Sequence, residues 1–218
     1  GRTKNRKVPI VSAATKKKTP RPEFEVGTED GRRQRSDRSR RRIIEALFDL
    51  ISEGNMSPSA ASVADRANVG LRTVFRHFED MDSIYDEMTE QLLAAIMPKV
   101  TAPFKSVTWR EKLIESIARR AEVYEAIFPM RVCMILRFHQ SDFIQEQYKR
   151  DVALERSTLK AILPQDIVAD RTLFAALEVT LSFPTWRRLR QDQKLSVETA
   201  KKTLQLMVEG LVAGVEID

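Results

Sequence analysis

The 218-residue sequence predicts an all-α protein, and three observations lead to that prediction. Apolar side chains recur every three or four residues through most of residues 37–214, which is the period of a helix that buries one face. No segment alternates strictly between apolar and polar residues with hairpin turns at its ends, so we expect no sheet. Prolines and a Gly-Asn pair divide the periodic stretches into segments of helical length.

The first 36 residues differ from the rest in charge and composition. Residues 1–42 contain 15 Lys or Arg against 5 Asp or Glu, a net charge of +10, whereas residues 43–218 have a net charge of −4. Residues 1–36 contain few large apolar side chains, so they cannot bury enough surface to offset their ordering entropy, and we expect a basic disordered arm. The arm either lies along the phosphates or minor groove of a nucleic acid, or is a solvated tail.

Residues 37–97 are predicted to form an N-terminal domain of three helices followed by a longer one. In the first helix Ile43, Leu47 and Ile51 lie on one face, and Gly54-Asn55 ends the helix. Four arginines crowd its predicted first turns, Arg38, Arg40, Arg41 and Arg42. This is the unfavourable end of the helix dipole for cations, and a nearby phosphate backbone would remove the conflict.

The segment from Ser57 to Ile84 predicts a helix-turn-helix. Its first helix begins at a cap formed by Ser57 or Ser59 and buries a face of small side chains, Val63, Ala64 and Ala67. Asn68 tolerates the left-handed backbone of the turn. A second helix follows at about residues 70–78, with Val74 and Phe78 pointing into the core. The longer helix is expected at about residues 80–95.

Pro98 and Pro103 mark the boundary to a second helical domain, residues 98–218. Helices are expected there near residues 108–127, 130–140, 142–163, 166–182 and 196–214. Three prolines are expected to separate them, Pro129, Pro164 and Pro184.

The helix-turn-helix segment resembles the TetR family of bacterial transcriptional regulators over about 50 residues, from Arg42 to Glu90. The residues that carry the resemblance are Val63-Ala64, Ala67-Asn68-Val69-Gly70, Thr73-Val74-Phe75, His77-Phe78, and Asp82 with Ile84. The sequence departs from the family pattern at three positions: Asn68 replaces a turn glycine, Phe75 a tyrosine, and Met81 a lysine. The last two remove groups that contact phosphate in the family.

The resemblance implies an N-terminal DNA-binding domain, and the residues supply candidate contacts. Arg40, Arg41, Ser59 and His77 are candidates for phosphate, and Gly70 permits close backbone approach. Arg72, Thr73 and Arg76 are candidates for base contacts, because arginine can fork onto guanine and a threonine methyl can touch thymine. Leu71 and Phe75 complete the expected DNA-facing surface. Alternatively, Arg72 and Arg76 are solvated surface charges.

The resemblance also implies that the C-terminal domain dimerises and binds a small effector. The predicted dimer interface is formed by Leu177, Leu181, Leu204, Met207, Val208, Leu211 and Val212. A monomer core explains the same apolar stripe without a partner. The predicted pocket for an apolar or aromatic effector is lined by Trp109, Tyr124, Phe128, Met134, Phe138 and Phe174. Core packing is the alternative for each of these side chains.

Other classes of protein and site have weaker support. The sequence has no Gly-rich phosphate loop and no nucleophile-base arrangement, so we expect neither an enzyme nor a cofactor. His139, Asp142 and Glu146 have metal-face spacing, but such groups are common by chance, and no metal is expected. The single cysteine, Cys133, is either a buried small hydrophobe or a redox sensor.

No apolar run approaches the ~20 residues needed to span a bilayer, and no apolar stretch follows the basic N-terminus as in a signal peptide. We therefore expect a cytoplasmic protein without a membrane partner. The leading hypothesis is a homodimeric, sequence-specific regulator that binds palindromic operator DNA, a repressor released by a small molecule. A regulator without a small-molecule effector is a variant of this hypothesis. The alternative is an architectural DNA-binding protein that uses the basic arm without sequence preference.

Overall fold

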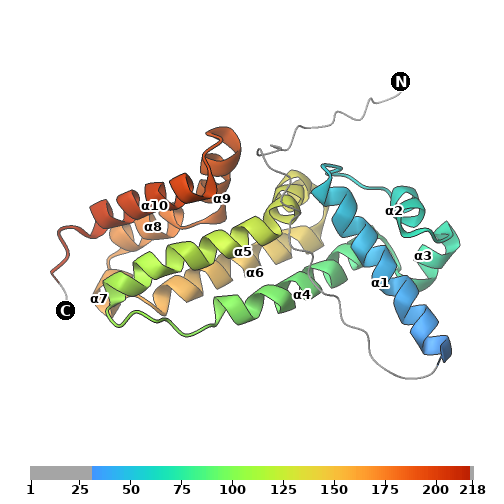
Figure 1. The fold of residues 1–218 in the computed structure, drawn as a ribbon, viewed down its shortest axis with the longest axis horizontal. Helices are drawn as coiled ribbons and strands as arrows, with labels where there is room; N and C mark the ends of the chain where they lie inside the picture. Colours follow the sequence, from blue (N-terminus) through green and yellow to red (C-terminus); the bar gives the residue numbers. More distant parts are fainter. Residues whose placement is uncertain (1–30, 217–218) are drawn as a thin grey trace. The chain divides into compact units, whose positions relative to one another are not determined.

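The computed structural model describes residues 31–216, and within this range the chain is helical without any strand (Figure 1). The elements are α1 (Gly31–Ser52), α2 (Ala60–Ala67), α3 (Leu71–His77), α4 (Met81–Val100), α5 (Trp109–Arg137), the 3-10 turn η1 (Phe138–Gln140), α6 (Asp142–Lys160), α7 (Gln165–Ala169), α8 (Arg171–Thr180), α9 (Phe183–Arg187), the π turn η2 (Arg188–Asp192) and α10 (Val197–Val212). The predicted all-α class is confirmed.

Helix α1 begins six residues earlier than the sequence predicts. It starts at Gly31 instead of Asp37, so the last residues assigned to the basic arm are helical. The rest of that arm, residues 1–30, lies outside the described residues. The earlier start also places Arg38 and Arg40–Arg42 beyond the first turn, where the helix dipole has little effect. The expected conflict between these arginines and the dipole is therefore absent.

The described residues divide into two compact units. The first contains residues 31–96 and 129–146, and the second contains residues 97–128 and 147–216. The sequence assigned residues 129–146 to the C-terminal domain. In the structure this segment belongs with the N-terminal helices, because Met130, Cys133 and Met134 are buried in their core.

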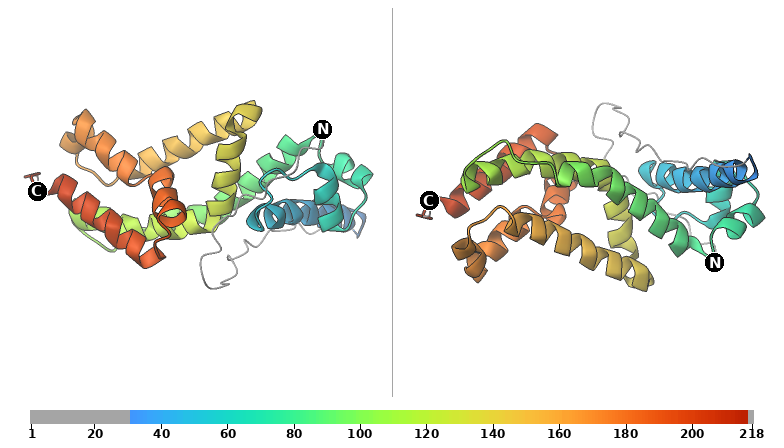
Figure 2. Two further views of the ribbon diagram at one scale, coloured as in Figure 1. Left: turned by 90° about the horizontal axis from the view of Figure 1, so that it is seen from above. Right: turned by 90° about the horizontal axis from the view of Figure 1, so that it is seen from below.

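The core of the first unit is built around the apolar face of α1. Ile43, Leu47 and Ile51 are almost fully buried, and α2 and α3 pack against this helix (Figures 1 and 2). Ile84 and Met88 close the same core from α4. Burying this stripe fixes where the helix-turn-helix lies within the unit.

Two prolines predicted to break helices lie inside them. Helix α5 continues through Pro129, so the two helices expected at residues 108–127 and 130–140 are one. Helix α4 continues through Pro98 to Val100. A proline removes one backbone hydrogen bond, and in α5 this loss is offset by buried side chains on both sides of it, Tyr124 and Met130.

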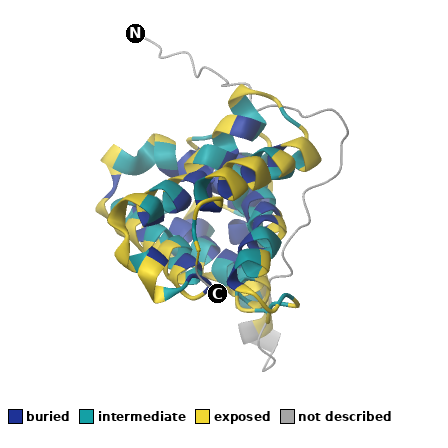
Figure 3. Ribbon diagram, turned by 90° about the vertical axis from the view of Figure 1, so that its left-hand side faces the viewer, coloured by how far each residue is buried: buried dark blue, intermediate teal, exposed yellow. Residues whose placement is uncertain are grey.

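The second unit has its own core, in which α8 packs against α10. Trp186 is fully buried and donates from its ring nitrogen to Glu125 Oε1 at 2.9 Å. The single helix expected at residues 166–182 is divided, because the Asp170 carboxylate caps α8 by accepting from the N–H groups of Thr172 and Leu173. Figure 3 shows buried residues along one face of the helices and exposed residues along the other.

Candidate nucleic-acid interface

A tight turn joins α2 to α3. Ser59 caps α2: its hydroxyl accepts from the N–H of Ser62 at 3.1 Å, and the Ser62 hydroxyl accepts from the N–H of Ser59 at 3.0 Å. Asn68 ends α2 with φ 52° and ψ 51°, so the left-handed turn expected there is present. Of the two serines considered as caps, Ser59 takes the role. Its exposed position at the helix start places backbone N–H groups toward solvent.

Helix α3 has an anchored face and an exposed face. Val74 and Phe78 are buried in the core, as the sequence predicts. Leu71 and Phe75 are 45% and 51% exposed. Thr73 is half-buried between the two faces. Leu71 and Phe75 therefore belong to the exposed face of the helix, opposite the two buried anchors.

Arg72 and Arg76 add positive charge to the exposed face of α3. Both side chains are exposed, and within the described part of the chain neither guanidinium makes a hydrogen bond or an ion pair. They are four residues apart, so they project from neighbouring turns of the same side. Both guanidinium groups are available to an external partner.

Gly70 caps α3 from extended backbone, with φ −71° and ψ 147°. A Cβ atom added there would meet only the Thr73 hydroxyl at 4.0 Å, an ordinary contact. The fold therefore does not require glycine at this position. Because glycine has no side chain, another molecule can approach the backbone closely at the start of α3.

The arginines of α1 differ in their surroundings. Arg40 binds Glu87 and the carbonyl oxygen of His77, so it is held within the first unit. Arg42 donates to the carbonyl oxygen of Asn68 at 3.4 Å. Arg41 is half-buried, and its Nε is buried without a hydrogen-bond partner among residues 34–216. Unlike Arg40, Arg41 makes no ion pair within this range.

His77 lies half-buried at the end of α3. Burial, followed by the charges of Arg76 and Arg40, lowers the pKa of His77 below its ordinary value, while Asp37 and Glu87 act in the opposite direction. Its ring is therefore neutral at pH 7, and a neutral imidazole attracts phosphate less than an imidazolium does. These properties favour a structural role over the predicted phosphate contact.

The six residues predicted to line an effector pocket are divided between the two units. Tyr124 and Phe128 pack edge-on against Phe183 in the second unit. Met134 lies in the core of the first unit, and Phe138 also belongs to that unit. Trp109 and Phe174 are buried in the second unit, and Arg156 lies over the Phe174 ring. Trp109, Tyr124, Met134 and Phe174 are buried, as the core-packing alternative expects, whereas Phe128 and Phe138 are half-buried.

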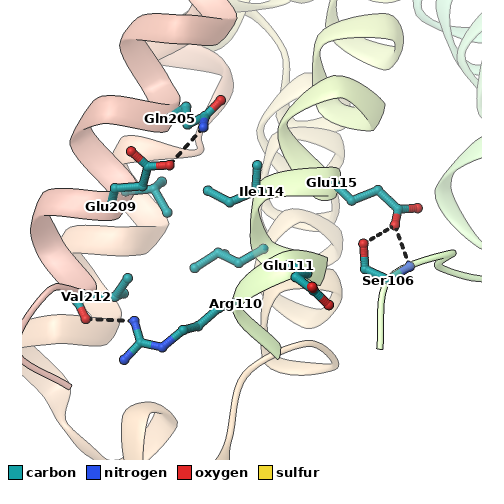
Figure 4. Close-up of a pocket in the computed structure, with 10 residues that line it drawn as sticks. Ser106, Arg110, Glu111, Ile114, Glu115, Gln205, Glu209 and Val212 are labelled. Atoms are coloured by element: carbon teal, nitrogen blue, oxygen red, sulfur yellow. Dashed lines mark hydrogen bonds between the residues drawn. The ribbon is translucent and has the colours of Figure 1, made fainter. Parts of the chain in front are cut away.

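A cavity of about 600 Å³ lies instead between the start of α5 and α10 (Figure 4). Leu113, Val208 and Val212 supply apolar walls, and the carboxylates of Glu111 and Glu209 lie at its edges. Arg110 spans one end and donates to the carbonyl oxygen of Val212 at 2.8 Å. None of the six predicted pocket residues lines this cavity.

Most of the residues predicted for a dimer interface are buried inside the single chain: Leu177, Leu181, Leu204, Val208 and Val212. Their stripe faces the chain's own core, so these side chains are not available to a partner, and the monomer-core explanation holds for them. Met207 is 41% exposed and Leu211 half-buried. The exposed apolar side chains beside this core are Val179 on α8 and Leu206 on α10, which are 64% and 72% exposed.

Two other kinds of site have no support in the described residues. No group of three or more His, Cys, Asp or Glu residues there could hold a metal ion, and this includes His139, Asp142 and Glu146. Within residues 31–216, none of the helices combines the length and apolar character that crossing a membrane requires.

Known structures share this fold. A transcriptional regulator from Rhodococcus sp. Rha1 matches 83% of this chain and 99% of its own, with a TM-score of 0.63 and 17% identity. A protein assigned to the TetR family of transcriptional regulators, from Mesorhizobium loti MAFF303099, matches 82% of this chain and 97% of its own, with a TM-score of 0.60 and 20% identity. No protein-family profile matches the sequence, and no curated protein sequence does. At these identities the likeness concerns the fold, and it agrees with the resemblance found in the sequence.

Proposed function

We propose that this chain, which has the fold of TetR-family transcriptional regulators, is a sequence-specific DNA-binding regulator that acts as a homodimer. The observation that carries the proposal is the division of α3 into two faces. Val74 and Phe78 hold the helix from behind, while Arg72 and Arg76 extend outward without a partner in the described residues. A helix of this length with its polar face free fits the major groove.

Phosphate and base contacts have different sources in this proposal. The phosphate backbone is bound by the capped start of α2 at Ser59 and by Arg41, which is half-buried and makes no ion pair among residues 34–216. These contacts set the position of the protein. Arg72 and Arg76 then fork onto guanine bases, and each good pair discriminates by about 1–3 kcal/mol. Phe75 and Leu71 touch thymine methyl groups or sugars. A half-site containing both guanine and thymine follows from this combination.

Dimerisation uses the outward faces of α8 and α10. Val179, Leu206 and Met207 are exposed apolar side chains there, and a Cβ added at Gly210 would meet no atom within 4 Å. A small residue on an exposed apolar face allows another helix to approach closely. Two copies of α3 related by a twofold axis would recognise an inverted repeat whose half-sites lie about one turn of DNA apart.

Repression and release by a small molecule complete the proposal. The supporting observation is the cavity between α5 and α10, whose volume of about 600 Å³ lies within the range of small-molecule sites. A ligand would release DNA only through different affinities for two states of the dimer. The direct check is whether apolar or aromatic compounds that raise the melting temperature also weaken operator binding.

Selection of bound duplexes from random DNA at one fixed salt concentration tests the function as a whole. An inverted repeat among the selected sequences would support a dimeric, sequence-specific regulator. Enrichment of no sequence, with affinity lost in moderate salt, would favour the architectural alternative in which the basic N-terminal residues supply the binding.

A further inference from the structure

The Arg40 side chain connects three helices of the first unit. Its Nε donates to Glu87 Oε2 at 2.7 Å, and its Nη2 donates to the same oxygen, which ties α1 to α4. Its Nη1 donates to the carbonyl oxygen of His77 at 2.7 Å, at the end of α3. Its guanidinium carbon lies 4.4 Å from the centre of the Phe78 ring. Each of its three nitrogens is thus engaged within the unit.

The contact with His77 is the one that acts on α3. The last carbonyl groups of a helix have no partner within the helix, and a cation placed there is favourable with respect to the helix dipole. Helix α3 extends only from Leu71 to His77, about two turns. A bond to its last carbonyl, together with stacking on the buried Phe78 ring, therefore fixes the direction of the entire helix.

The contact with Glu87 makes Arg40 a poor phosphate ligand. The carboxylate neutralises the guanidinium, and the two side chains shield each other: Glu87 is 23% exposed and Arg40 is 41% exposed. A phosphate near Arg40 would have to displace this carboxylate or approach it against charge repulsion. Arg41, on the same helix, makes no ion pair among residues 34–216 and lacks this obstacle.

We infer that Arg40 is a positioning residue, which with Glu87 orients α3 for base contact and does not itself bind phosphate. The inference rests on the proposed function, because orientation of α3 matters only to a protein that binds DNA through it. The inference also explains why an acidic residue, Glu87, lies near the proposed DNA-binding surface: it holds Arg40 in place.

Three full-length variants separate positioning from phosphate binding: Arg40→Gln, Arg40→Lys and Glu87→Gln. The probe is the duplex that the wild-type protein selects from random DNA, compared with a shuffled duplex. If Arg40 positions α3, all three variants bind the selected duplex about tenfold more weakly, with the dependence on salt unchanged. Lysine fails because it cannot hold Glu87 and the His77 carbonyl in one planar fork. A loss of preference over the shuffled duplex distinguishes positioning from a general loss of stability.

A phosphate contact predicts a different pattern. Arg40→Gln would then lower the salt slope by about 1, Arg40→Lys would bind like wild type, and Glu87→Gln would bind more tightly because a negative charge is removed. Any of these three results overturns the inference. The matched control is Arg41→Gln on the same helix, which is expected to weaken binding to both duplexes equally and to lower the slope by about 1.

Amide hydrogen exchange tests the same contacts without DNA. The N–H of Phe78 donates to the Val74 carbonyl oxygen at 2.9 Å, at the end of α3. Its exchange is expected to accelerate about tenfold in Arg40→Gln and Glu87→Gln, but not in Arg41→Gln. Unchanged exchange in both would overturn the inference while leaving the proposed function intact. A wild-type protein that selects no sequence would overturn both.

Discussion

The thiol of Cys133 donates a hydrogen bond to the carbonyl oxygen of Met56, 3.3 Å away. This bond joins the last turns of α5 to the loop between α1 and α2. The hydroxyl of Tyr85, on α4, lies 3.8 Å from the same sulfur. One buried side chain therefore connects the segment that contains residues 129–146 to two parts of the N-terminal helices.

This environment predicts an unreactive thiol. Burial raises the pKa of Cys133, which outweighs the opposing effects of Tyr85 and Arg137, so less thiolate is present at pH 8 than in an exposed cysteine. Alkylation of the native protein by iodoacetamide at pH 8 should be at least about tenfold slower than alkylation of the unfolded chain. Equal rates would favour the redox-sensor alternative.

Truncation of Phe78 and of Phe75, three residues apart, should affect stability and DNA binding differently. Phe78 is buried, so Phe78→Ala should lower the free energy of unfolding by about 3–5 kcal/mol. Phe75 is exposed, so Phe75→Ala should change it by less than about 0.5 kcal/mol while weakening DNA binding. Urea unfolding and binding titrations on the same samples measure both effects. Equal destabilisation by the two substitutions would mean that α3 is not anchored as described.

The outward face of α10 should control the oligomeric state. Leu206→Glu places a charge on the proposed interface, and because Leu206 is exposed the fold should be retained. We expect this variant to sediment as a monomer and to bind an inverted repeat at least about a hundredfold more weakly than wild type. Gln205→Glu is the matched control, since Gln205 is exposed on the same helix and lines the cavity facing α5. A dimer that persists in Leu206→Glu would place the interface elsewhere.

Stability should depend on pH through His77. Because the folded state lowers the pKa of His77, the unfolded chain binds a proton more readily between its ordinary pKa near 6.5 and the lower folded value. The free energy of unfolding contributed by this residue should therefore fall as the pH falls below about 6.5. Urea unfolding at pH 7.5 and pH 5.5 should show a smaller drop for His77→Asn than for wild type. An equal drop in both proteins would count against the effect.

The sequence predicted the helix-turn-helix well, because its determinants are local. Asn68 sets the turn through its own backbone preference, and Val74 and Phe78 mark the buried face through their spacing. The partner of Arg40 could not be predicted in this way. Glu87 lies 47 residues further along the chain and has no local signature, so only the packing of α4 against α1 brings it close.

The residues of a C-terminal interface are harder to predict for a related reason. An apolar stripe such as that of Leu204 and Val208 shows that one helix face is buried, but it does not identify what covers it. Here the chain's own core covers the stripe. Leu206 lies on a different side of α10 and is exposed. The strong local preference of proline predicts a helix end at Pro129, yet buried side chains on both sides of it hold α5 together.

Contact between α3 and the bases can be tested by pairing one side chain with one base. In the duplex selected by the wild-type protein, each guanine of a half-site is replaced in turn by 7-deazaguanine, which lacks the N7 acceptor. Binding is then measured for wild type, Arg72→Ala and Arg76→Ala. We expect wild type to lose about 1–3 kcal/mol of binding free energy at specific guanines, and one of the two variants to lose no further affinity at each of them. Equal sensitivity of all three proteins at every guanine would contradict this expectation, because the outward face of α3 would then not be in contact with the bases.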